Sequence, residues 1–107
     1  MKVSKHYTSF HIAGFSYWDG LDVIDELKIG TKLKLKAEPT NGYDPKAVKI
    51  MYKDTMLGYI PRTDNRDISK FLQLGHKDLF KVQIAQIDLE NHPEKQILVS
   101  VKIKEKK

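Results

Sequence analysis

The feature of this sequence that most limits its fold is a series of short segments in which apolar and polar residues alternate. Such alternation has the period of two that a β-strand needs to place one face in a core. The segments are YTSFHIAGF (7–15), TKLKLKAE (31–38), AVKIMYK (47–53), MLGYIP (56–61), FKVQIAQIDL (80–89) and QILVSVKI (96–103). The alternation changes phase between Ile84 and Ile87, which indicates a β-bulge. Six short strands in one small chain predict a mainly β domain.

Two further segments follow a helical pattern. In residues 16–30, apolar residues recur at helical spacing until Gly30 ends the run. In residues 62–75, Asp64 is expected to be the N-cap and Gly75 the C-terminal stop. We therefore expect two short α-helices. Because six strands in an open sheet would leave two exposed edges, a small closed barrel is favoured over a sandwich.

The overall composition limits the class of protein. The 107 residues are 40% hydrophobic and 31% charged, which predicts one domain over 1–107 that buries roughly two-thirds of its unfolded surface. There is no cysteine, so disulfides and thiolate-bound zinc are excluded. No apolar run approaches the ~20 residues of a membrane span, and we expect a cytoplasmic protein without a membrane partner. A basic tail, 102–107, contributes +3 of the net charge of +5, which is weak support for a nucleic-acid partner.

The sequence offers little that points to catalysis or to a cofactor. The four histidines lack the close spacing of metal ligands, and neither a phosphate-binding glycine loop nor a nucleophile elbow is present. One enzymatic pattern remains as an alternative: Glu38, Asp44 and Lys46 match the acids and lysine of a magnesium-dependent nuclease. Three residues match such a pattern often by chance. The expectation is a binding protein with no metal site and no cofactor.

Aromatic and basic residues in loops point instead to binding. Tyr17 and Trp18 are adjacent at the expected end of the first strand, so one ring should enter the core and the other should remain accessible. Tyr43 lies in a loop, and Tyr59 and Arg62 flank a proline. Rings beside cations suit single-stranded nucleic acid, in which bases stack and phosphates meet positive charge. Simple packing at the rim of a core is the alternative.

Asn41 and Asp44 lie in the same loop, within EPTNGYDPKAVKI (38–50). Asn-Gly makes a turn and an aspartate caps it, which explains both residues without a ligand. A carboxylate near a nucleic acid would repel phosphate, yet it would accept a hydrogen bond from a terminal sugar hydroxyl. Both interpretations stay open at this point.

Three segments, IAGFSYWDG (12–20), EPTNGYDPKAVKI (38–50) and LGYIPR (57–62), resemble the HIRAN domain family in order and spacing. That family occurs beside Swi/Snf-type ATPase modules and as free-standing bacterial proteins. The resemblance implies an OB-like barrel that binds single-stranded DNA and recognises its free 3′-hydroxyl end. It also implies a separately encoded ATPase, helicase or nuclease partner, and it leaves a DNA-repair role and a mobile-element role open.

The resemblance also assigns a nucleic-acid-binding set, namely Tyr17, Trp18, Asn41, Tyr43, Asp44, Tyr59 and Arg62. In this set Asp44 would accept the 3′-hydroxyl, Asn41 would hold the terminal nucleotide, and the first three aromatic residues would stack on bases. Tyr59 and Arg62 would contact phosphate. Two departures imply missing contacts: Ser16 stands where members carry arginine, and the segment 88–96 has no aromatic ring. A protein-interaction or adaptor domain without a nucleic-acid ligand remains the second hypothesis.

Overall fold

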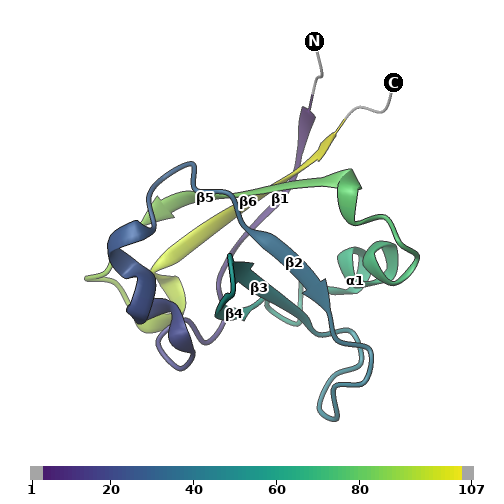
Figure 1. Ribbon diagram of the computed structural model, residues 1–107, viewed down its shortest axis with the longest axis horizontal. Coiled ribbons are helices and arrows are strands. Elements are labelled where there is room, and N and C mark those ends of the chain that lie inside the picture. Colours follow the sequence, from purple (N-terminus) through teal and green to yellow (C-terminus); the bar gives the residue numbers. More distant parts are fainter. Residues whose placement is uncertain (1–3, 105–107) are drawn as a thin grey trace.

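The computed structural model describes residues 4–104, and its β-structure consists of two three-stranded antiparallel sheets (Figure 1). The first sheet has the order β1-β6-β5 and the second has the order β2-β3-β4. The strands are β1 (Ser4–His11), β2 (Lys34–Ala37), β3 (Val48–Tyr52), β4 (Thr55–Tyr59), β5 (Phe80–Ile87) and β6 (Ile97–Lys104). The prediction of a mainly β domain with six strands is confirmed. Within the predicted basic tail, residues 102–104 belong to β6, and 105–107 lie outside the described residues.

Isolated bridges join the two sheets at both of their edges. Ala13 pairs with Tyr59 after β1 ends, and Lys32 pairs with Gln83 before β2 begins. The first of these bridges has two backbone hydrogen bonds, of 2.8 and 3.0 Å. No continuous ladder closes the strands of residues 4–104 into a ring, so the OB-like barrel stays a prediction. The predicted β-bulge is confirmed by a shift of register between Ile84 and Gln86.

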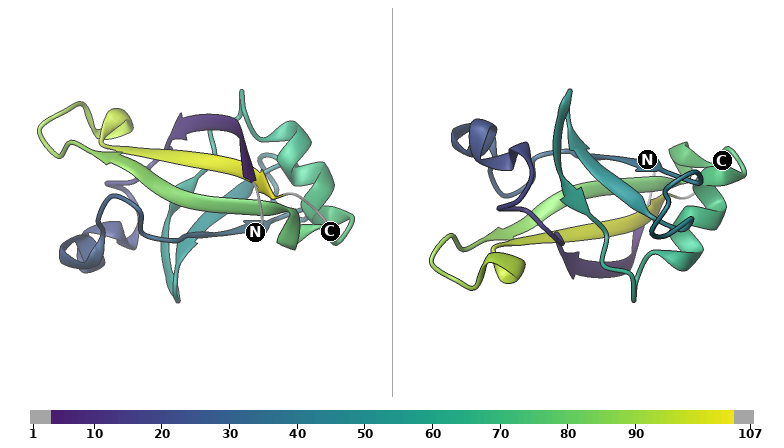
Figure 2. Two further views of the ribbon diagram at one scale, coloured as in Figure 1. Left: turned by 90° about the horizontal axis from the view of Figure 1, so that it is seen from above. Right: turned by 90° about the horizontal axis from the view of Figure 1, so that it is seen from below.

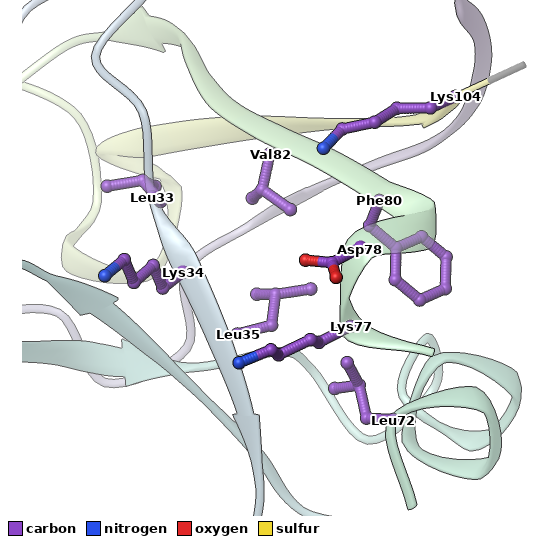
Figure 3. Close-up of a pocket in the computed structure, with 9 residues that line it drawn as sticks. All are labelled: Leu33, Lys34, Leu35, Leu72, Lys77, Asp78, Phe80, Val82 and Lys104. Carbon is purple, nitrogen blue, oxygen red and sulfur yellow. The ribbon is translucent and has the colours of Figure 1, made fainter. Parts of the chain in front are cut away.

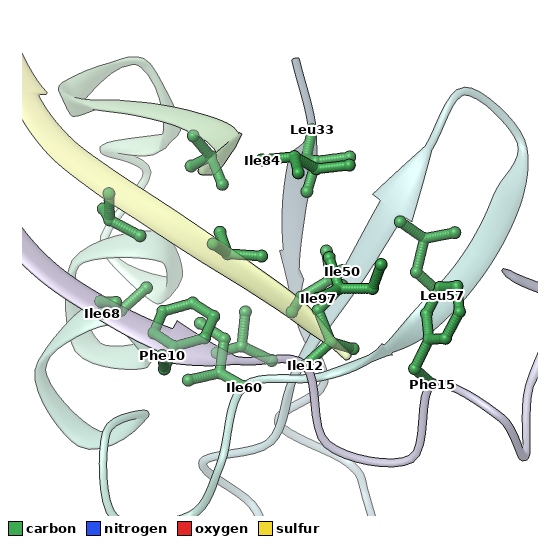
Figure 4. Packing of buried hydrophobic residues seen from close by; sticks show 14 of the residues in the cluster. Phe10, Ile12, Phe15, Leu33, Ile50, Leu57, Ile60, Ile68, Ile84 and Ile97 are labelled. Carbon is green, nitrogen blue, oxygen red and sulfur yellow. The ribbon is translucent and has the colours of Figure 1, made fainter. Parts of the chain in front are cut away.

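The core lies between the two sheets, and their apolar faces meet there (Figure 4). Alternate residues of β3, β5 and β6 supply half of it, as the period of two requires. On the other face of β2, Lys34 and Lys36 are exposed, as expected for a strand with one wet side. Ile68 enters the core from a helix at one end of the sheets. The sheets therefore form a rigid frame on which the loops are held.

The helical elements differ in part from the prediction. The segment after β1 forms a 3-10 helix, η1 (Asp19–Glu26), instead of an α-helix. It contains four carboxylates and no base, and acidic pairs three or four residues apart destabilise an α-helix. The second segment does form an α-helix, α1 (Arg66–Gln73), but Asn65 occupies the N-cap position predicted for Asp64. In Figures 1 and 2, η1 and α1 lie at opposite ends of the domain.

Two short 3-10 turns complete the structure. They are η2 (Lys77–Leu79), before β5, and η3 (Pro93–Lys95), in the loop between β5 and β6. The β5–β6 loop lies at the same end of the domain as η1 (Figures 1 and 2). No helix within residues 4–104 is long and apolar enough to cross a membrane.

Candidate functional site

A hollow of about 580 Å³ opens beside β4, between the turn that follows β1 and the loop that precedes β3. We call it the aromatic hollow. All seven residues of the predicted binding set line it, namely Tyr17, Trp18, Asn41, Tyr43, Asp44, Tyr59 and Arg62. They come from three separate parts of the sequence, and the lining also includes Ala13, Ala47 and Ile60. The fold thus brings the set together; whether it binds nucleic acid stays a prediction.

Three aromatic rings form one wall of this hollow. Trp18 packs edge to face against Tyr17, with ring centroids 5.1 Å apart, and against Tyr59 at 5.8 Å. The prediction that one of Tyr17 and Trp18 enters the core is wrong, because β1 ends at His11 and both residues lie in a turn. Phe15 is fully buried in their place. Tyr17 remains 80% exposed, so its ring is accessible to solvent.

Two glycines make this wall possible. Gly58 has φ of +149°, and a Cβ there would lie 2.4 Å from the carbonyl oxygen of Ala13. Only glycine lets β4 approach the end of the first strand closely enough for the Ala13–Tyr59 bridge. Gly14 turns the chain with φ of +75°, and the Trp18 indole lies against it. The turn thereby aims the indole along the sheet toward Tyr59.

The loop that precedes β3 is organised by Asn41. Its Oδ1 accepts hydrogen bonds from the backbone N–H of Tyr43 (2.8 Å) and of Asp44 (3.1 Å). Its Nδ2 donates to Glu38 at 3.1 Å. Asn41 therefore does shape the turn, as the interpretation without a ligand predicts. The tight turn leaves the Tyr43 ring 93% exposed above the hollow, without a packing partner that would explain it.

Glu38 connects this loop to the aromatic wall. Its Oε1 accepts the Tyr59 hydroxyl at 2.7 Å, and its Oε2 lies 3.4 Å from the Lys49 ammonium. Partial burial raises the pKa of Glu38, but hydrogen bonds from Tyr59, Asn41 and Lys49 outweigh it and lower the pKa overall. Burial, and then the bond to Glu38, raises the pKa of Tyr59 to about 12. Tyr59 is thus a neutral phenol whose hydroxyl donates a hydrogen bond to Glu38.

Asp44 is the carboxylate of the hollow. Its Oδ1 accepts the backbone N–H of Lys46 at 2.9 Å, and its Oδ2 accepts the Asn65 amide at 2.9 Å. Arg62 Nε lies 3.5 Å from Oδ2. The two hydrogen bonds, together with the Arg62 and Lys46 charges, hold the pKa of Asp44 below its usual value. Asp44 is therefore ionised at neutral pH and can only accept hydrogen bonds.

Asp44 retains room for one more donor. A carboxylate has about four acceptor positions, and two hydrogen bonds and one ion pair leave a position on Oδ1. Its side chain is 15% exposed and contributes to the lining of the hollow. Arg62 is 77% exposed and also donates to the Tyr43 carbonyl oxygen at 3.3 Å. The site therefore places one anionic acceptor beside an accessible cation.

Sequence reasoning missed Asn65. Its side chain is 2% exposed and makes no N-cap hydrogen bond; it points across to Asp44 instead. Asparagine is as good an N-cap as the aspartate before it, so local preferences predict a cap here. The contact joins residues that are 21 apart in the sequence, so no local sequence pattern predicts it.

The nuclease alternative gains no support from this geometry. Glu38 and Asp44 face different partners, and each carboxylate is held by hydrogen bonds of its own. Within residues 4–104, no three histidine, aspartate or glutamate side chains are grouped as metal ligands would be. Ser16 and the segment 88–96 do not contribute to the lining of the hollow. Glu94 of that segment nevertheless accepts the Gly14 N–H at 2.8 Å, which brings it next to the aromatic wall.

This fold is shared with a known family of domains. The chain belongs to the HIRAN domain family, whose model matches residues 5–106. That family is known for nucleic-acid binding. The suspected resemblance is thereby confirmed, and the single-domain prediction is compatible with the length of the match.

Solved structures share the fold. A protein from Lactobacillus plantarum superposes with a TM-score of 0.80 at 18% identity, covering 99% of this chain and 100% of its own. The HIRAN domain of human HLTF superposes with a TM-score of 0.70 at 16% identity, covering 97% of this chain and 81% of its own. No curated protein sequence matches the chain. At such identities the similarity establishes the fold alone.

Proposed function

We propose that this protein binds single-stranded DNA at its 3′ end and that the aromatic hollow holds the terminal nucleotide. The observation that carries the proposal is Asp44: an ionised acceptor with one free position, inside a hollow rimmed by accessible rings. A free 3′-hydroxyl is a donor that fits this position. A strand end is therefore accepted where an internal phosphate would be repelled.

The surrounding groups supply the rest of the affinity. Tyr17 and Tyr43 present rings on which the last bases stack, each stack contributing about 1–3 kcal/mol. Arg62 and Lys46 offer positive charge to the phosphate that precedes the terminal sugar. Asn41 and Glu38 fix the loop so that these groups are arranged before the ligand arrives.

The membership of a nucleic-acid-binding family supports this function over an adaptor role. We further propose that the protein recognises the 3′ end, prefers DNA and is not a catalyst. The adaptor hypothesis predicts no binding above a weak background that disappears with salt.

The proposal is tested by fluorescence anisotropy on one internally labelled oligonucleotide at fixed salt. It is prepared with a 3′-hydroxyl, with a 3′-phosphate, and as a closed circle. We expect tight binding only to the hydroxyl form, because the phosphate would face the Asp44 carboxylate and the circle has no end. Equal affinity for the three forms would contradict end recognition, and no binding to any of them would favour the adaptor role.

Variants at Tyr43 form a matched pair for the stacking contribution. Tyr43→Ala should weaken binding about 5- to 150-fold, the range that one base stack provides. Tyr43→Phe keeps the ring and should bind nearly as well as the wild type. Since Tyr43 is 93% exposed, both variants should keep the wild-type melting temperature. If alanine and phenylalanine behave alike, stacking on Tyr43 is not part of the site.

A further inference from the structure

Three more hollows continue from the aromatic hollow along one side of the domain. The first, of about 540 Å³, shares Asn41, Tyr43 and Tyr59 with it and runs over the loop toward Lys36. The next, of about 390 Å³, shares Lys36, Ala37 and Pro39 with the first. The last, of about 370 Å³, shares Leu35, Leu72 and Lys77 with the second. Each hollow thus adjoins the next through shared lining residues, and we call this series, which leads from the aromatic hollow past β2, the groove.

Lysines follow this groove. Lys36 lines its middle, Lys77 lies where the last two hollows join, and Lys34 and Lys104 line the far end. Figure 3 shows this far end, with Leu35, Leu72 and Val82 as its apolar floor between β2, α1 and β5. All four lysines are exposed, and within residues 4–104 none of them lies within ion-pair distance of a carboxylate.

Acidic groups along the groove are few. Glu38 lines the first of the three hollows, but its charge is already matched by Lys49 at 3.4 Å. Asp78 lies at the far end among three lysines. The three hollows beyond the aromatic hollow therefore each keep a net positive charge.

The other ways out of the aromatic hollow are acidic. On the side of Trp18, η1 carries Asp19, Asp22, Asp25 and Glu26 with no base of its own, and Glu26 is paired with Lys53 at 3.6 Å. The neighbouring β5–β6 loop adds Asp88, Glu90 and Glu94 against one lysine, Lys95, and Glu94 accepts a hydrogen bond from the turn that carries Trp18. Beyond Arg62, a smaller hollow is lined by Asp64 and Asp67 with Arg66. A polyanion leaving the aromatic hollow meets repulsion in these directions and attraction only along the lysines.

We propose that the single strand runs from the aromatic hollow along this groove in the 3′-to-5′ direction, with Lys36, Lys77, Lys34 and Lys104 receiving its phosphates in that order. The inference rests on the proposed function, because a 3′ end held at Asp44 fixes which way the chain must continue. Each lysine neutralises one phosphate as the strand passes. The binding site then covers several nucleotides, in the range of ~4–16 nucleotides that OB folds cover. It recognises only the terminal nucleotide.

The test varies the length of a 3′-hydroxyl oligonucleotide between two and ten nucleotides. The paired charge reversal Lys36→Glu with Lys77→Glu is compared with a control of equal charge change, Lys28→Glu with Lys95→Glu, at the acidic end of the domain. All four positions are exposed, so both variants should keep the wild-type melting temperature. For each protein the affinity is measured against length and against salt.

We expect wild-type and control affinity to rise with each added 5′ nucleotide until the groove is filled. In the Lys36/Lys77 variant, affinity should no longer rise with strand length. The slope of log affinity against log salt concentration should be shallower by about 1.4, which is roughly 0.7 for each of two phosphates. Lys34→Glu should weaken only the longer strands, because Lys34 lies further from Asp44 along the groove. The ratio of 3′-hydroxyl to 3′-phosphate affinity should stay unchanged in all of them.

The two proposals fail in different ways. If both double variants weaken long strands equally, or neither does, the strand takes another path and the groove proposal is overturned while end recognition can still hold. If the wild type shows no 3′-hydroxyl preference but the Lys36/Lys77 variant still loses affinity with length, the end-reading function fails. The groove would then be a path without a fixed direction, and the order of contacts proposed here would also be wrong.

Discussion

Tyr59 shows how one residue can serve both the frame and the site. Its backbone pairs with Ala13, its ring meets Trp18, and its hydroxyl donates to Glu38. A neutral phenol is needed in this position, because a phenolate would face the Glu38 carboxylate. Burial and the bond to Glu38 accordingly hold the pKa of Tyr59 at about 12.

This pKa has a consequence for stability. Since it is raised above the usual value of 10.0, the contribution of Tyr59 to stability is complete below pH 10 and is lost as the pH rises toward about 12. Ultraviolet titration should detect a tyrosine that ionises near pH 12, and Tyr59→Phe should remove that step. Tyr17→Phe, at an exposed ring, is the control and should leave it. A titration in which every tyrosine ionises near pH 10 while the protein stays folded would contradict the account.

At the level of elements, the β-structure was predictable because its signal is local. Alternation located all six strands and the phase change located the bulge at Ile84. The errors arose where other interactions override a local pattern: acidic pairs shift η1 away from α-helical bonding, and the contact with Asp44 occupies the Asn65 side chain. Tyr17 and Trp18 were misplaced because Gly14 turns the chain before the strand pattern ends.

The junction of β4 with the end of the first strand is the element on which the aromatic wall depends. Gly58→Ala would place a Cβ 2.4 Å from the Ala13 carbonyl oxygen and 2.6 Å from Ile12 Cγ2, at a φ that side chains rarely adopt. We expect a loss of unfolding free energy of about 1–3 kcal/mol or more, together with weaker DNA binding. Urea unfolding measures the first effect. Gly42→Ala is the matched control, because a Cβ there meets nothing within 4 Å, and similar losses in both variants would argue against this account of the junction.

Across the whole molecule, charge is distributed more unevenly than the net value of +5 indicates. Carboxylates belong to η1 and the β5–β6 loop, whereas lysines line the hollows beside β2 and α1. Figure 1 shows that η1 and the β5–β6 loop lie at one end of the domain and α1 at the other. Neither group is a run in the sequence: Lys34 and Lys104 lie on different strands and meet only in the fold. The seven site residues could be named from motif resemblance, whereas the groove that leads away from them could only be found in three dimensions.

The central claim is that Asp44 accepts a hydrogen bond from the terminal 3′-hydroxyl, and a four-way comparison of binding affinities tests it most directly. Strands ending in a 3′-hydroxyl or in a 3′-deoxy sugar are each measured against the wild type and Asp44→Ala. The wild type should prefer the hydroxyl roughly 10- to 150-fold, the range of a hydrogen bond to a charged group, and Asp44→Ala should bind both strands equally. Asp64→Ala, which removes a neighbouring carboxylate outside the hollow, should keep the preference. A preference that survives in Asp44→Ala, or is missing from the wild type, would contradict the claim.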